Sequence, residues 1–97
     1  MNYKPRPGIV QTKICGVHVL IPTREAYEYC KAILRLPMLW AMTFELLEKG
    51  EADENIIRLH KILTKKPEEE ICSRIERFCE ELSDKGFLIK ENVEEKQ

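Results

Sequence analysis

The stretch VHVLIPTREAYEYCKAILRLPMLWAMTFELLEKG, residues 17–50, holds the features that decide the fold of this chain. It starts with a β-branched and aliphatic run at residues 17–21, and Pro22 ends that run because proline cannot donate to a strand ladder. At residues 38–49, apolar side chains cover well over half of a helix circumference, and Gly50 then supplies a stop signal. The stretch therefore predicts a sheet that leads into a central, mostly buried helix.

A second strand precedes this stretch. Within residues 9–14, Val10, Thr12 and Ile14 alternate with polar residues, which is typical of a half-buried strand. A Cys-Gly pair follows and provides a two-residue turn, with glycine where a positive φ is needed. We therefore expect residues 9–14 and 17–21 to form a hairpin.

A third strand is expected between the hairpin and the central helix. Residues 23–29 are polar enough for a loop, with one helical turn capped by Thr23. Residues 30–36 then read as the strand, and Pro37 separates it from the helix.

Two further helices follow the central one. Asp53 is predicted to be the N-cap of a helix that ends near Thr64, with an apolar stripe of Ile56, Leu59 and Leu63. The last helix is predicted at residues 67–85, with Pro67 in its first turn and three glutamates beside the positive end of its dipole. Its apolar face consists of Ile71, Ile75, Phe78 and Leu82.

The composition indicates one globular domain. The chain has 97 residues, of which 43% are hydrophobic and 34% charged, and no apolar run approaches the length of a membrane span. We expect an extended arm at residues 1–8, the domain at residues 9–89, and a disordered polar tail at residues 90–97. The first residues contain no apolar signal region, so the expected location is cytoplasmic.

The cysteines and histidines predict no chemistry of their own. In the cytoplasm all four cysteines are expected as free thiols, and Cys72 and Cys79, seven apart on one helix face, as core residues. His18 and His60 have no partner at catalytic or metal-ligand spacing, so each is expected to be a packed or surface histidine. The chain also lacks a nucleophile–base pair and a phosphate loop. We therefore expect a binding module that is no enzyme and holds no metal or cofactor.

A winged-helix DNA reader is the main alternative, since it also combines three helices with a small sheet. Residues 67–85, which would be the recognition helix, contain three basic and seven acidic residues, a net charge of −4. Phosphates would repel such a helix.

Four segments together resemble one protein family. VHVLIPT, AILRL, FELLEKG and EEEICSRIERFCEELSDKGFL are similar to the pyrroloquinoline quinone biosynthesis protein D (PqqD-like) family, over about residues 9–89. Members are stand-alone precursor-peptide recognition elements of ribosomal peptide modification systems. The resemblance implies an α+β, winged-helix-like fold in which an N-terminal three-stranded antiparallel sheet is followed by three helices. It further implies that a leader peptide binds as a fourth strand beside strand three and against helix three. A partner enzyme, often a radical S-adenosylmethionine enzyme, would then modify the peptide.

The residues agree with an exposed strand edge next to an apolar helix face, which is a recognised peptide-binding arrangement. Arg74 lies at the border of that helix face and is expected to meet an acidic side chain of the leader. A scaffold subunit that uses the same edge to form a dimer remains a further alternative. The predicted peptide-binding residues are Lys31, Ala32, Ile33, Leu34, Arg35 and Leu36 on the strand, and Ile71, Arg74, Ile75 and Phe78 on the helix.

Overall fold

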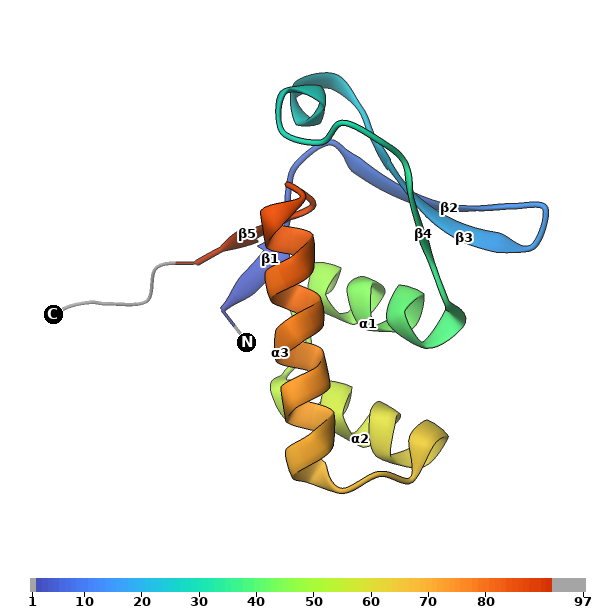
Figure 1. The fold of residues 1–97 in the computed structure, drawn as a ribbon, viewed down its shortest axis with the longest axis vertical. Helices are drawn as coiled ribbons and strands as arrows, with labels where there is room; N and C mark the ends of the chain where they lie inside the picture. Colours follow the sequence, from blue (N-terminus) through green and yellow to red (C-terminus); the bar gives the residue numbers. More distant parts are fainter. Residues whose placement is uncertain (1, 92–97) are drawn as a thin grey trace, which may run out of the picture.

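The computed structural model describes residues 2–91, which form an α+β fold with a three-stranded antiparallel sheet followed by three helices (Figure 1). The predicted fold class is confirmed in these terms. Within residues 2–91, no helix is long and apolar enough to cross a membrane. The elements in chain order are β1 (Tyr3–Pro5), β2 (Ile9–Ile14), β3 (Val17–Pro22), the 3-10 helix η1 (Arg24–Glu28), β4 (Leu34–Leu36), α1 (Met38–Glu48), α2 (Asp53–Thr64), α3 (Glu68–Asp84) and β5 (Leu88–Lys90).

The predicted hairpin is confirmed, but its first strand buries the face that carries Ile9 and not the face that carries Val10, Thr12 and Ile14. β2 and β3 pair in continuous antiparallel register, and both turn residues, Cys15 and Gly16, have positive φ, as a tight hairpin turn requires. Ile9 is buried, whereas Val10 and Ile14 are 47% and 50% exposed. Both sets of alternating positions in β2 contain aliphatic residues, so the pattern alone does not select the face.

The third strand is shorter than predicted. We expected it at residues 30–36, but β4 contains only Leu34–Leu36. Continued along the observed register, Ala32 would lie opposite Pro22, which has no N–H to donate. Upstream, the Cys30 amide donates to the Ala26 carbonyl (2.9 Å) and closes η1, the helical turn that was predicted in this loop. Thr23 lies at its N-cap, but its hydroxyl donates to the Gly8 carbonyl and does not cap the turn as predicted.

The N-terminal segment is extended, as predicted, but it is also paired. β1 and β5 form a separate two-stranded antiparallel sheet with Tyr3 opposite Lys90. Arg6 strengthens the junction, because its Nε donates to the Gly86 carbonyl (2.7 Å) and its guanidinium lies 3.7 Å from the Tyr29 ring centroid. Lys90, the first residue of the expected tail at residues 90–97, belongs to β5, and residues 92–97 lie outside the described part of the chain.

The helices begin without capping side chains. The N-cap of α2 is Ala52, so the prediction of Asp53 is wrong by one position, and Asp53 instead lies in the first turn, where the helix dipole favours an acidic residue. Pro37 and Pro67 are the N-caps of α1 and α3, and neither provides a side-chain cap.

A single core joins the sheet to the helices. From the sheet it takes Ile9, Leu20 and Leu36, and from α1 it takes the fully buried Phe44. The predicted buried face of α3 is confirmed for all four of its residues. The predicted stripe of α2 is only partly right, since Leu63 is 53% exposed.

The four cysteines are free and differ in burial. Cys79 is buried as predicted, but Cys72 is exposed, so the two do not share the core face. Burial raises the pKa of the Cys79 thiol to about 11 and also raises the pKa of Cys30. Both buried thiols therefore stay protonated near neutral pH and are poor nucleophiles.

Candidate peptide-binding groove

The open side of β4 offers backbone hydrogen-bonding groups. In antiparallel ladders, hydrogen-bonded and non-hydrogen-bonded pairs alternate. The Thr23 amide donates to the Gly8 carbonyl (2.8 Å), so odd-numbered residues of β3 bond toward β2 and even-numbered ones toward β4. The two leucines of β4 therefore bond to β3, and the amide and carbonyl of Arg35 point away from it. Within residues 2–91, this outward pair makes no further backbone hydrogen bond.

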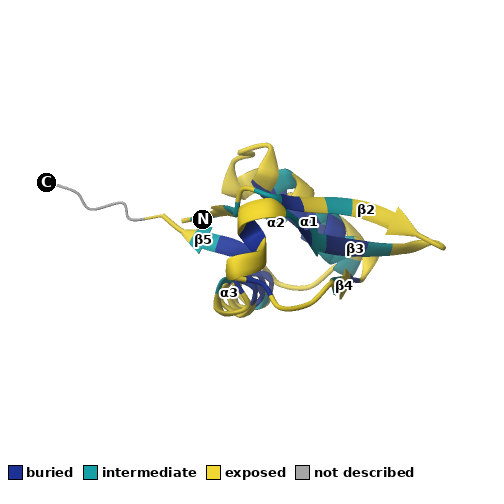
Figure 2. Cartoon of the chain, turned by 90° about the horizontal axis from the view of Figure 1, so that it is seen from above, coloured by how far each residue is buried: buried dark blue, intermediate teal, exposed yellow. Residues whose placement is uncertain are grey.

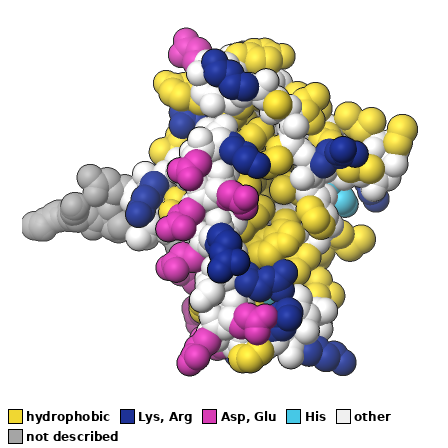
Figure 3. All heavy atoms as spheres, viewed as in Figure 1, with side chains coloured by type: hydrophobic (Ala, Val, Ile, Leu, Met, Phe, Trp, Pro, Cys, Tyr) yellow, Lys and Arg dark blue, Asp and Glu magenta, His cyan; other side chains and the backbone are white. Residues whose placement is uncertain are grey.

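A groove of about 310 Å³ lies between this edge and α3. Hydrophobic side chains lie between the charged surface of α3 and the sheet in Figure 3. An extended chain lying here would run beside β4 with α3 as its second wall. The groove is lined by Leu34, Arg35, Leu36, Pro37, Trp40, Arg74, Arg77, Phe78, Glu81, Leu82 and Lys85.

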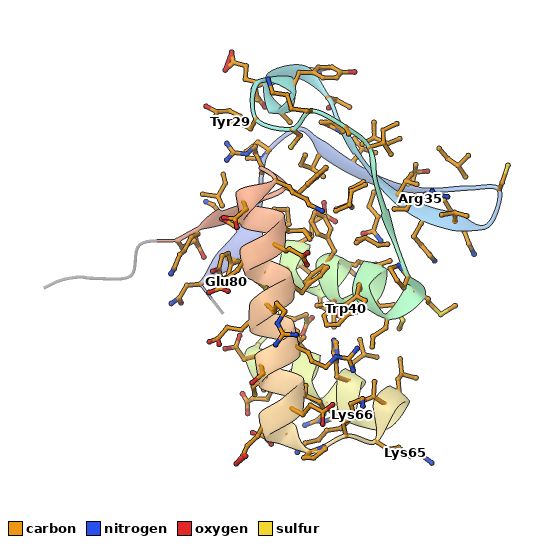
Figure 4. All side chains as sticks on the ribbon, in the orientation of Figure 1. Tyr29, Arg35, Trp40, Lys65, Lys66 and Glu80 are labelled. Atoms are coloured by element: carbon orange, nitrogen blue, oxygen red, sulfur yellow. The ribbon has the colours of Figure 1, made fainter. Side chains whose placement is uncertain are left out.

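Trp40 joins α1 to α3 beneath the groove (Figure 4). Its ring stacks on Phe78 with centroids 4.6 Å apart and an interplanar angle of 27°. It also meets the His60 ring in a T-shaped contact, with centroids 4.9 Å apart and an interplanar angle of 61°. The Arg74 guanidinium carbon lies 5.7 Å from the Trp40 ring centroid, so a cation sits over the aromatic surface.

A buried hydrogen-bond chain supports Trp40 from behind. The Thr43 hydroxyl donates to the Leu39 carbonyl (2.9 Å) and lies 2.7 Å from Nε2 of His60. Because the single hydroxyl proton is used toward Leu39, Nε2 of His60 donates to Thr43. Burial first, and then the charge of Arg74, lowers the pKa of His60. The imidazole is therefore neutral at neutral pH and holds the edge of Trp40 in place.

On α3, the basic residues line the groove, and most acidic residues lie outside it. All three basic residues of the predicted helix, Arg74, Arg77 and Lys85, line the groove, but of its seven acidic residues only Glu81 does. With Arg35 from β4, the described lining carries four basic groups and one acidic group. The groove is therefore positively charged although the whole chain has a net charge of −1.

The structure brings together half of the predicted site residues. Leu34, Arg35, Leu36, Arg74 and Phe78 all line the groove. The other five do not line it. Lys31, Ala32 and Ile33 lie in the exposed segment before β4. Ile71 and Ile75 are each 1% exposed and belong to the core.

The sequence reasoning missed the remaining lining residues. Trp40 was assigned to the core, whereas its ring is half-buried and also forms part of the groove. Along α3, the spacing of Arg74, Arg77, Glu81 and Lys85 places them on one stripe next to the buried face. That stripe was the available signal, since it collects the basic residues of an otherwise acidic helix.

Other parts of the described chain do not present a clearer site. In residues 2–91, no three His, Cys, Asp or Glu side chains come together as metal ligands. A larger hollow of about 580 Å³ lies between the N-terminal segment and the end of α1, but its rim mixes Lys4, Arg6 and Lys49 with Glu48 and Glu51. Such mixed charge favours no ligand of either sign. In comparisons with known proteins, no family model, curated protein or solved structure matches this chain.

Proposed function

We propose that this protein is a non-catalytic peptide chaperone. It binds the leader segment of a ribosomally made precursor peptide as an added strand on β4. It then presents the precursor to a modifying enzyme, for which a radical S-adenosylmethionine enzyme is the class that the family resemblance suggests. The observation that carries the proposal is the groove, in which an unpaired strand edge faces a helix wall whose basic residues all point inward.

The groove supports an extended ligand with acidic side chains. The outward amide and carbonyl of Arg35 can pair with one residue of an added strand, as in other cases of strand addition. Trp40 and Phe78 supply apolar and aromatic contact area, while Arg74 and Arg77 can form charge-assisted hydrogen bonds to carboxylates. Main-chain bonding would give affinity, and the basic wall would give selectivity.

A binding role also accounts for the titratable groups. His60, the buried histidine, is engaged by Thr43, and the buried thiols Cys30 and Cys79 have raised pKa values. A cytoplasmic location fits four free cysteines. The described groove lining holds no nucleophile beside a base, and the proposal assigns the chemistry to the partner enzyme.

The DNA-binding alternative is less well supported. The basic residues of α3 face the groove, and its remaining acidic residues lie outside the groove lining, as the charged side of the helix in Figure 3 shows. A recognition helix needs the opposite arrangement to approach phosphates.

A pair of synthetic peptides tests the proposal. One alternates valine with glutamate and the other alternates valine with lysine, so they differ only in charge. Trp40 is the single tryptophan, so its fluorescence reports events in the groove. We expect the glutamate peptide to change this fluorescence saturably and to shift the amide resonances of β4 and of residues 74–85. Equal binding of both peptides, or shifts confined to another surface, would refute the proposal.

A further inference from the structure

The sheet has a second open edge, β2, on the side opposite β4. β2 is twice as long as β4, with six residues against three. Edge strands are commonly protected by proline, bulges or several charges. β2 contains no proline, pairs with β3 without interruption and carries one charged residue, Lys13. Figure 2 shows it at the border of the sheet with no further strand beyond it.

The alternation that exposes Arg35 also determines which groups of β2 point outward. The residues of β2 that do not bond to β3 are Ile9, Gln11 and Lys13. The Ile9 amide is already used in a turn, where it donates to the Arg6 carbonyl (3.2 Å). In residues 2–91, Gln11 and Lys13 make no other backbone bond on this side. Both therefore keep a free amide and a free carbonyl.

We propose that β2 pairs with β2 of a second copy of this chain, antiparallel and around a two-fold axis at Thr12. In this register Gln11 of one copy lies opposite Lys13 of the other, and the free amides and carbonyls of both residues form four backbone hydrogen bonds. The two Thr12 side chains meet at the axis. Val10 of each copy lies beside Ile14 of the other, which covers two of the exposed aliphatic side chains. No other register of this kind satisfies all of the free groups.

Charge complementarity favours a second copy as the occupant. Gln11 donates through Nε2 to the Ala41 carbonyl of α1 (3.0 Å). Glu45 and Glu48 lie one and two turns further along that face of the helix and border the hollow beside β2, together with Lys49, whose ammonium group pairs with Glu45 (3.1 Å). The partner's Lys13, placed opposite Gln11, brings an ammonium group toward these carboxylates.

The pairing closes on itself and leaves the groove free. Each chain has one β2, so two copies complete a six-stranded sheet whose outer edges are the two β4 strands. A dimer of this kind carries two peptide grooves. The inference is independent of what the groove binds.

Sedimentation velocity over a range of concentrations tests the dimer. We expect wild-type protein to shift reversibly from the mass of one chain to the mass of two. Lys13→Pro removes an outward amide but no β2–β3 bond, so it should be monomeric where wild type is dimeric, with an unchanged circular dichroism spectrum. Lys13→Ala keeps the backbone amide and should retain most of the dimer. A wild-type protein that stays monomeric at its highest soluble concentration overturns the proposal, and so does a Lys13→Pro variant that still dimerises.

Disulfide trapping tests the register. In a background with the exposed thiols removed by Cys15→Ser and Cys72→Ser, Thr12→Cys should form a cross-linked dimer on mild oxidation. Val10→Cys is the matched control, because the two copies of position 10 would be about 13 Å apart along the strands. Equal cross-linking of the two variants would show that the proposed register is wrong. If Lys13→Pro binds the valine–glutamate peptide as wild type does, dimerisation through β2 and peptide binding in the groove are independent properties.

Discussion

The two edges of the three-stranded sheet offer the same backbone chemistry in opposite surroundings. β4 is short and faces α3 across the groove, into which the helix presents Arg74, Arg77 and Lys85. β2 is long, and the hollow beside it is bordered by Glu45, Glu48 and Lys49 at the end of α1. Unpaired amides and carbonyls bind any extended chain equally well. We therefore expect the basic wall beside β4 to favour an acidic peptide, and the free backbone groups of β2 with the carboxylates of α1 to favour a lysine-bearing second copy.

The largest effect on stability is expected in β3, the central strand that pairs with both edge strands. Leu20 lies in the central strand β3 and is fully buried in the core. Leu20→Ala removes its packing and should lower the free energy of unfolding by about 2–5 kcal/mol. Urea denaturation measures this loss, and both peptide binding and dimerisation should weaken together.

Val19→Ala is the matched control, because Val19 is the next residue of β3, points to the opposite face, and is buried without belonging to the core cluster. It should cost clearly less than Leu20→Ala. Equal losses for the two variants would mean that the core does not lie on the face we describe.

A substitution on the wall of the groove should weaken peptide binding at β4 and leave dimerisation through β2 unchanged. Arg74→Glu reverses a charge that lies over Trp40 and removes a charged hydrogen-bond donor from the groove. We expect a loss of about 1–3 kcal/mol in binding of the valine–glutamate peptide, roughly 5- to 150-fold in affinity, measured by calorimetry. The dimer should form as in wild type.

Arg58→Glu makes the same charge change at an exposed position of α2 outside the groove lining. It should leave peptide affinity nearly unchanged apart from a small, salt-screened term. If both variants lose affinity equally, net charge rather than the groove wall would explain the binding.

The parts of the fold that the sequence predicted well have local causes. The Cys-Gly turn, Pro22 and Gly50 each act on their immediate neighbours, and the hairpin and α1 follow from them. The length of β4 depends instead on its register with β3, which would place Ala32 opposite Pro22 and which is set only once the sheet has formed. The pairing of β1 with β5 is likewise non-local, and strands of three residues carry too little pattern to reveal it.

The groove shows a similar limit. The apolar period of α3 identified its buried face correctly, and Arg74 and Phe78 at the border of that face do line the groove. Periodicity alone does not distinguish a face that packs into the core from one that borders a groove, so Ile71 and Ile75 were assigned to the site although they are core residues. The basic residues spaced along the adjacent stripe carried the missing information.

The smallest expected effect is a pH dependence that belongs to the groove side alone. His60 is buried behind Trp40, bonded to Thr43, and its pKa in the folded protein is lowered from 6.5, first by burial and then by Arg74. In the unfolded chain the histidine takes up a proton as the pH falls through about 6.5, while the folded protein does not until the pH reaches its lower pKa. Stability is therefore full above pH 6.5 and declines below it.

Chemical denaturation between pH 7.5 and about 5.5 should show this decline, with a slope below the limit of about 1.4 kcal/mol per pH unit for one proton. His60→Gln keeps a donor for Thr43 but does not titrate, so its stability should depend less on pH than that of wild type. His18→Gln makes the same substitution at the other histidine, on β3, and serves as the matched control. In the folded protein, Trp40 fluorescence and peptide affinity should stay constant until the pH reaches the lower pKa of His60, where protonation would loosen the support of the groove. The β2 dimer, which has no contact with His60, should be unaffected over this range. A slope that persists in His60→Gln would assign the pH dependence to other groups and remove His60 as the support of Trp40.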